Sequence, residues 1–246
     1  MADDTTQVLL AHSVLVGLTP LIPIPILDDY VKDHVERRLT LEIGRRHGIE
    51  LAPADVAALM GEGEGGLLRS VATAVVTFPL RLVFRKLFMV LEVKRASDEA
   101  SRSFHYAYLL DRALSWRAMA PHGAASPGLV REAIVAACEG ITVSPMAGAF
   151  RAVLEGSKDL VAAASESLLR AVRPKQRGAH VAPEDVQRGV DAASNGPVSP
   201  IVERLKAAMN EVPSEHFAAL EAAFAAKLGV SAPPFSSGLG EPRREP

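Results

Sequence analysis

The spacing of hydrophobic and polar positions along the chain predicts helices. Two segments repeat apolar residues every fourth position, as expected for a helix with one buried face. In 29–47 these residues are Val31, Val35, Leu39 and Ile43. In 157–172 they are Leu160, Ala164, Leu168 and Val172. No run of alternating β-branched residues is long enough to indicate a strand. We therefore predict an all-α, multi-helix bundle.

Capping residues mark the expected helix boundaries. Ser–Pro pairs at 126–127, 144–145 and 199–200 each predict a helix start. The serine hydroxyl can cap the first turn there, and proline lacks only an N–H that would have no helical partner. Gly48 is expected as the left-handed residue that ends the helix over 29–47, and Gly229 as the stop of a terminal helix over 214–228.

The longest stretch without proline or glycine is 80–119. It predicts either one uninterrupted helix or two helices separated at Ser97–Asp98, because both of these residues are good N-caps. The following segment, 122–128, reads HGAASPG and is the best candidate for a boundary between two halves. We expect an N-terminal domain over 1–120, a C-terminal domain over 121–230, and a disordered tail over 231–246 that is rich in Pro, Gly and Ser.

The opening stretch, 8–29, is apolar and is interrupted by Pro20, Pro23 and Pro25. We expect a helix over 8–19, an extended elbow, and a second helix that begins near Asp28, so that the whole forms a proline-broken hairpin. The first helix would be about 18 Å long, too short to cross a hydrocarbon core of about 30 Å. Three covers remain open for this hairpin: the core of a soluble bundle, a membrane interface, or a partner.

A basic segment follows at 79–95, where five Lys and Arg residues face the single acid Glu92. A basic strip beside a broad apolar face is typical of a helix lying in a membrane interface, and it also describes a core helix with one wet edge. The expected membrane or partner contacts combine the elbow with this segment. They are Leu21, Ile22, Ile24, Ile26, Leu27, Arg81, Phe84, Arg85, Lys86 and Phe88.

Composition excludes several classes of protein. The net charge is −2 and aromatic residues make up only 5% of the chain, so we expect no binding to nucleic acid. A single cysteine, Cys138, rules out an internal disulfide and is expected to be a small packing residue. The acidic start MADDTTQ does not resemble a secretory signal, so the expected location is the cytoplasm or the periphery of the inner membrane.

Motifs for catalysis or cofactors find little support. Gly61, Gly63 and Gly66 match GxGxxG, but a helical segment precedes them instead of a strand, so we expect a linker. No phosphate-binding loop, HExxH or GxSxG sequence occurs. The densest group of potential metal ligands is better explained as acids at a helix start; it consists of Asp28, Asp29, Asp33 and His34. We predict no enzyme activity, no cofactor and no metal.

Residues 17–59 resemble a known family. The sequence PIPILDD, the helix that ends at His47–Gly48, and the segment IELAPAD at 49–55 are similar to the EcsC-like helical family and to a related domain of unknown function found beside some bacterial GTPases. The chain departs from the pattern by carrying His47 where an aromatic residue is usual, and by having no GTPase module. The resemblance implies a helical, membrane-associated bacterial protein without known catalysis, and it supplies no catalytic residues.

Three functions follow as hypotheses. The first is a non-enzymatic helical protein that associates peripherally with a membrane through the apolar hairpin and the basic helix. The second is a soluble helical scaffold or homo-oligomer that buries the same apolar surfaces between subunits. The third is a module that binds an apolar ligand, such as a lipid, in a pocket between helices.

Overall fold

The protein is helical throughout the part that the computed structural model describes, which comprises residues 2–21, 27–61, 85–119, 122–140, 144–172 and 183–230. No strand occurs in these ranges, and an isolated β-bridge joins Met119 to Ala125. The elements in chain order are α1 (Ala2–Leu18), η1 (Thr19–Leu21), α2 (Leu27–Arg46), α3 (Pro53–Met60), α4 (Arg85–Ser115), α5 (Pro127–Glu139), α6 (Pro145–Glu155), α7 (Lys158–Val172), α8 (Pro183–Ala193), η4 (Ser194–Val198), α9 (Ser199–Met209) and α10 (Ser214–Leu228). The expected all-α bundle is confirmed.

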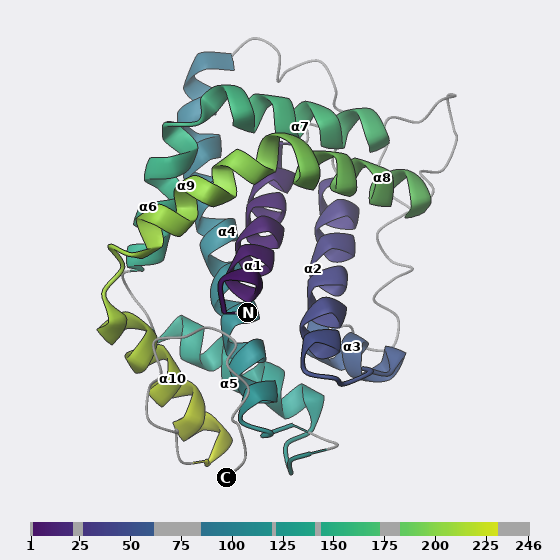
Figure 1. Cartoon of the computed structure of the whole chain (residues 1–246), viewed down its shortest axis with the longest axis vertical. Coiled ribbons are helices and arrows are strands. Elements are labelled where there is room, and N and C mark those ends of the chain that lie inside the picture. Colours follow the sequence, from purple (N-terminus) through teal and green to yellow (C-terminus); the bar gives the residue numbers. More distant parts are fainter. Residues whose placement is uncertain are drawn as a thin grey trace.

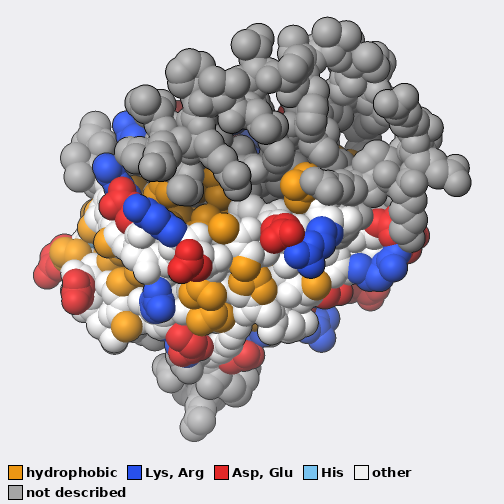
Figure 2. Space-filling model, turned by 90° about the horizontal axis from the view of Figure 1, so that it is seen from above, with side chains coloured by type: hydrophobic (Ala, Val, Ile, Leu, Met, Phe, Trp, Pro, Cys, Tyr) orange, Lys and Arg blue, Asp and Glu red, His pale blue; other side chains and the backbone are white. Residues whose placement is uncertain are grey.

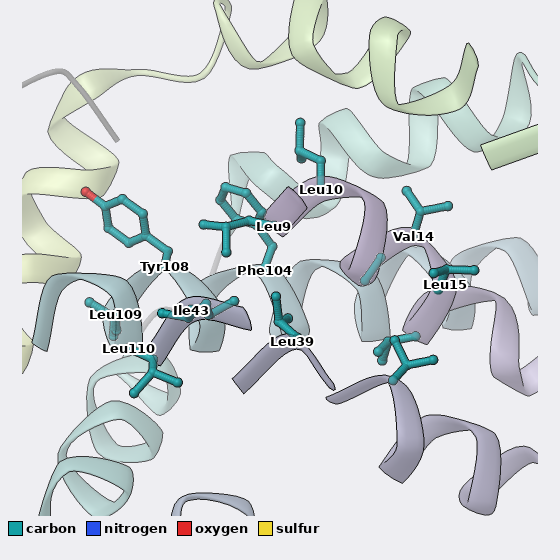
Figure 3. Packing of buried hydrophobic residues seen from close by; sticks show 14 of the residues in the cluster. Leu9, Leu10, Val14, Leu15, Leu39, Ile43, Phe104, Tyr108, Leu109 and Leu110 are labelled. Carbon is teal, nitrogen blue, oxygen red and sulfur yellow. The ribbon is translucent and has the colours of Figure 1, made fainter. Parts of the chain in front are cut away.

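Helix α1 lies in the middle of the bundle, where it contacts α2, α4 and α9 (Figure 1). Its leucines are fully buried, with Leu9, Leu10 and Leu15 each 0% exposed. The close-up in Figure 3 shows Leu9 and Leu10 near Phe104 of α4. The chain itself therefore covers the apolar helix that was expected over 8–19, because three surrounding helices supply its apolar environment.

The contact between α1 and α4 is unusually close at Gly17. A Cβ atom built on this glycine would lie 2.5 Å from the backbone oxygen of Ala96 and 2.7 Å from the Cβ of Ala100. Small residues on both helices let the two backbones approach, and any larger side chain at position 17 would push them apart. Both alanines are buried, at 1% and 0% exposure.

Helix α2 presents the predicted apolar face to the core. Val31, Val35, Leu39 and Ile43 are all buried. The helix begins at Leu27 and ends before Gly48, whose φ of 68° is the left-handed conformation expected of a C-terminal glycine. On its outer side Arg46 Nε donates to Glu42 Oε1 at 3.0 Å, an ion pair between residues one helical turn apart.

Helix α4 runs without a break through Ser97–Asp98, so the single-helix alternative holds for the described part of 80–119. Ser97 does not cap a new helix. Its hydroxyl donates to the carbonyl of Val93, one turn earlier, at 2.7 Å, and its side chain is buried. Because the Ser97 hydroxyl is hydrogen-bonded to a carbonyl of its own helix, it does not cap the N-terminus of a second helix.

Two of the three Ser–Pro predictions are confirmed. Ser126 and Ser144 cap α5 and α6 by accepting hydrogen bonds from the backbone N–H three residues ahead. The third prediction is confirmed only in part: α9 begins at Ser199 with proline in its first turn, but Ser199 does not cap it. The wide turn η4 already winds the chain into α9, with the kink at Gly196, so the N-cap position falls on Val198 and Ser199 lies inside the helical path.

Buried apolar residues of both predicted halves belong to one hydrophobic cluster. It reaches from Leu9 in α1 through Phe104 and Tyr108 in α4 to Phe150 in α6 and Phe224 in α10. Helices α7 and α8 lie across one end of the bundle, and α5 and α10 lie at the other (Figure 1). The division into two domains stays a prediction, and the expected tail over 231–246 lies outside the described residues.

Candidate functional site

A cavity of about 270 Å³ lies between α2, α3, α4 and α5, and we call it the α2–α5 pocket. Each of the four helices contributes side chains to its wall. The lining residues are Lys32, Glu36, Leu39, Thr40, Ile43, Leu59, Met60, Glu99, Arg102, Ser103, Tyr106, Ala107, Leu110, Arg131 and Val135. Pockets with an apolar lining and a few convergent polar groups are the usual form of small-molecule sites.

The apolar side of the pocket is part of the hydrophobic core. Leu59 and Leu110 are fully buried, and Leu39 and Ile43 come from the same apolar face of α2 that packs on the bundle. This wall is rigid because its residues are held by core packing on their other sides. It offers an apolar surface of fixed shape to anything that enters.

The polar side of the pocket carries an ion pair between α2 and α4. Lys32 Nζ lies 2.9 Å from Glu99 Oε2, and both side chains are partly exposed. Arg102 extends toward solvent, with its guanidinium 3.5 Å from the other carboxylate oxygen of Glu99. The neighbouring acids Glu36 and Glu99 raise the pKa of Lys32 against the opposing effect of burial, so its ammonium group stays charged.

Glu36 is the unusual acid of this site. Its carboxyl group makes no hydrogen bond or ion pair with other described residues, and its backbone carbonyl accepts a bond from Thr40. Burial raises the pKa of Glu36 to about 7, although the nearby charge of Lys32 acts in the opposite direction. The side chain therefore exchanges a proton near neutral pH, within the reach of an occupant of the pocket.

Tyr106 and Arg131 form the far side of the polar wall. The Tyr106 hydroxyl donates to the carbonyl of Leu59 at 2.5 Å, and burial raises its pKa, so it remains a neutral donor. The Arg131 guanidinium lies against Gly61, where a Cβ would come within 2.4 Å of its Cζ. Gly61 has a φ of 74° at the C-terminus of α3, where free carbonyls favour a nearby cation.

A second polar cluster holds α10 against α4. Arg112 Nε lies 2.8 Å from Glu221 Oε1, and both side chains are only 5% exposed. The hydroxyl of Tyr108 donates to the same carboxylate oxygen, and the Arg112 guanidinium stacks over the Tyr108 ring. Figure 3 shows the Tyr108 hydroxyl directed toward α10. The cluster thus joins α10 to α4 through an ion pair and a hydrogen bond that share one carboxylate oxygen.

The buried His105 and the half-buried His216 meet beside this cluster. Nε2 of His105 in α4 lies 2.9 Å from Nε2 of His216 in α10, so one ring must donate a proton and the other must accept it. Burial lowers the pKa of His105 to about 4, and the pKa of His216 also falls. Both rings are therefore neutral at physiological pH, and Phe104 and Phe217 pack around them.

The predicted contact residues are only partly described. Leu21 is half-buried and packs against the core. Ile22, Ile24, Ile26, Arg81 and Phe84 lie outside the described residues, as do the side chains of Leu27, Arg85, Lys86 and Phe88. The contact surface formed by these residues stays a prediction. The expectation that the whole 8–29 hairpin contributes to it is corrected, because α1 is enclosed by α2, α4 and α9.

The cysteine and the predicted group of acidic residues at the start of α2 lie among packing and helix-end contacts. Cys138 is half-buried against the core, and burial raises the pKa of its thiol to about 11. Asp29 lies in the first turn of α2, and His34 Nε2 is hydrogen-bonded to Gln187 Oε1 of α8 at 2.9 Å. No group of three potential metal ligands occurs within the described ranges. Gly61 caps α3, and the rest of GEGEGG lies outside them.

The described surface carries little large apolar area. Leu41, Leu129 and Val230 are the exposed large hydrophobic residues there, and they are far apart in sequence. On the face shown in Figure 2, acidic and basic side chains are interspersed wherever described residues are visible. None of the helices in the described ranges has both the length and the apolar character needed to cross a bilayer.

The pocket escaped sequence analysis because its residues belong to four separate segments. Lys32, Glu36 and Thr40 recur every fourth residue along the edge of the apolar stripe of α2, and this was the one local signal. From the sequence alone, polar residues at that spacing predict a helix side that faces solvent, because the neighbouring helix is not known. Tyr106 and Arg131 carry no local signal, because only the fold brings α4 and α5 to the same cavity.

Comparisons of this chain with family models, with curated proteins and with solved structures find no match. The resemblance of residues 17–59 to the EcsC-like helical family therefore stays a prediction.

Proposed function

We propose that this is a non-enzymatic helical protein that binds a small amphipathic molecule in the α2–α5 pocket. The observation that carries the proposal is the composition of the pocket wall: an apolar floor from the core faces a polar side on which Glu36 and Arg131 have no hydrogen-bond partner among the described residues. Both side chains are partly buried, so water reaches them in the empty pocket, and a bound molecule with a polar end would replace that water.

Support for binding over catalysis comes from the chemistry of the lining side chains. The residues that line the pocket include no cysteine, histidine or aspartate, and neither the Ser103 nor the Tyr106 hydroxyl is hydrogen-bonded to a carboxylate of the described residues. Burial keeps the Tyr106 hydroxyl neutral, and that hydroxyl is already committed to the carbonyl of Leu59. These groups are suited to holding a molecule and lack an activated nucleophile.

Filling the pocket tests this proposal. Ser103 lines the cavity and is 7% exposed, so Ser103→Leu would place a branched apolar side chain in the space that a ligand needs. We expect native mass spectrometry to show a small molecule retained by the wild-type protein and lost from this variant. Ala107→Leu fills the same cavity and serves if the first variant does not fold.

The matched control is Ala152→Leu, the same kind of enlargement on the exposed side of α6. It should retain the bound molecule at the wild-type level. Equal retention by all folded variants would show that the molecule binds elsewhere, and a wild-type protein that carries nothing and accepts no added amphiphile would contradict the proposal.

Peripheral membrane association is a separate prediction, and the structure describes the side chain of only one of its contact residues, Leu21. If the elbow and the basic segment contact lipid, flotation with anionic liposomes should recover the protein, and charge reversal at Arg81, Arg85 and Lys86 should abolish the recovery. Charge reversal at Arg151 and Arg188, two exposed arginines elsewhere on the molecule, is the control. A well-folded sample that stays at the bottom of the gradient would exclude lipid contact.

A further inference from the structure

The charges that line the α2–α5 pocket do not cancel. Three cations, Lys32, Arg102 and Arg131, face two acids, Glu36 and Glu99. Glu99 is engaged with Lys32 at 2.9 Å and lies 3.5 Å from Arg102, whose side chain is 76% exposed and well solvated. Arg131 and Glu36 are the two partly buried charged side chains of the wall that have no ion-pair partner among the described residues, so both are available to an occupant.

Arg131 is positioned to receive an anionic group. Its guanidinium is held in place against the backbone of Gly61 at the end of α3, and no carboxylate of the described residues pairs with it. A planar guanidinium presents several N–H donors in a fixed arrangement, which suits carboxylate and phosphate oxygens. The positive charge also acts on the hydroxyl of Tyr106, so Arg131 and Tyr106 are electrostatically coupled.

Glu36 lies in the same region, because its charge acts on the same Tyr106 hydroxyl. The charges that act on Glu36 are Lys32 and Asp33 on α2 and Glu99 on α4. Arg131 on α5 lines the same pocket and acts on Tyr106, whereas Leu59 and Met60 of α3 bring no charge. An anion entering this region would repel an ionised Glu36. The same anion would accept a hydrogen bond from a protonated Glu36, so anion entry favours the protonated form.

The size of the cavity limits what can bind. About 270 Å³ lies just below the range of roughly 300–1,000 Å³ that is typical of pockets for drug-sized ligands. A long-chain lipid would not fit within this volume, whereas a short alkyl chain would contact Leu39, Ile43 and Leu59. The apolar floor and the polar wall together require a molecule with one apolar end and one polar end.

We propose that the α2–α5 pocket binds a short-chain organic anion, a carboxylate or a phosphate monoester, with the anionic head at Arg131 and with uptake of one proton by Glu36. This inference rests on the proposed function, since it names the class of ligand and the regulation of the same site. Binding is then stronger in mildly acidic solution than in mildly alkaline solution.

Four probes that share one chain length separate the effect of charge from that of the apolar chain: octanoate, octyl phosphate, octylammonium and octanol. Isothermal titration calorimetry on the full chain is expected to show binding of one or both anions, weaker binding of octanol, and no binding of octylammonium. Comparison of octanoate with octyl phosphate identifies the head group. Arg131→Gln is expected to weaken anion binding by roughly tenfold to a hundredfold, whereas Arg151→Gln, on the exposed side of α6, should leave it unchanged.

Proton uptake is tested with octanoate, which stays ionised across the range used. Its affinity is expected to be about tenfold weaker near pH 8 than near pH 6, because the free protein must first acquire the proton. Titrations in buffers of different ionisation enthalpy should show a proton bound with the ligand. Glu36→Gln keeps the hydrogen-bond donor and removes the charge, so its affinity should be independent of pH.

Three results would overturn the inference or part of it, and each leaves a different part of the proposal in place. Binding of octylammonium or octanol as tight as that of the anions, abolished by Ser103→Leu, would refute the anionic ligand and keep the pocket as a ligand site. Binding of no probe, together with no retained molecule in native mass spectrometry, would refute the proposed function as well. An affinity for octanoate that does not change with pH in the wild-type protein would refute the proton uptake.

Discussion

Replacing Glu221 by alanine is expected to lower the free energy of unfolding by about 3–5 kcal/mol, because the change removes the carboxylate that pairs with a buried arginine and accepts from a buried tyrosine hydroxyl. Glu221 receives both the guanidinium of Arg112 and the hydroxyl of Tyr108, and the Arg112 and Glu221 side chains are 5% exposed. Urea denaturation followed by circular dichroism measures the loss. The helix most affected is α10, which this cluster joins to α4.

The chain contains a matched control for this substitution. Glu155 pairs with Arg151 on α6 at 2.9 Å, with the same residue types but with side chains 44% and 50% exposed. Glu155→Ala should cost no more than about 0.5 kcal/mol, since exposed ion pairs contribute little. Equal losses for the two variants would show that the Arg112–Glu221 pair is not enclosed as the structure has it.

The second large effect is a loss of stability in acid caused by the paired histidines. Burial holds the pKa of His105 at about 4, below its ordinary value of 6.5, and lowers that of His216 as well. The unfolded chain therefore binds protons at these rings before the folded chain does. The free energy of unfolding therefore does not change with the titration of these rings above pH 6.5, and it decreases as the pH falls from 6.5 toward about 4. The expected decrease that comes from His105 is about 3 kcal/mol in total.

The variant His105→Gln removes this titrating group, because glutamine stays uncharged at every pH in the range used. The difference in unfolding free energy between wild type and His105→Gln is expected to change by about 3 kcal/mol between pH 7 and pH 4, in favour of the variant at low pH. Taking the difference cancels the titration of the carboxylates. His122→Gln, on an exposed residue, is the control. A difference that stays constant over this pH range would show that His105 is not buried as a neutral ring.

The features of the fold that could be predicted from the sequence depend on residues close together in the chain. The four-residue spacing of Val31, Val35, Leu39 and Ile43 predicts which face of α2 is buried, because a helix places such residues on one side. Ser126 and Ser144 predict helix starts, since capping depends on a few adjacent residues. Such features need no knowledge of the neighbouring helices.

Features that depend on distant segments are not readable in this way. Ser199 looks like Ser126 in sequence, but the turn at 194–198 continues the helical path and removes its capping role. Helices α2, α4 and α9 surround α1, and the sequence of 8–29 does not specify these neighbours. That sequence alone therefore leaves open whether the apolar helix packs in the core, against a membrane or against a partner. The candidate site is the extreme case, because Glu36, Tyr106 and Arg131 converge from three helices.

A crystal structure of the protein purified in detergent-free buffer tests the central claim, that the α2–α5 pocket is a binding site, most directly. We expect continuous electron density for a non-protein molecule inside the pocket, with its polar end within hydrogen-bonding distance of the Arg131 guanidinium and its apolar end against Leu39 and Leu59. A pocket that contains only ordered water, both in this crystal and in one grown with octanoate, would contradict the account.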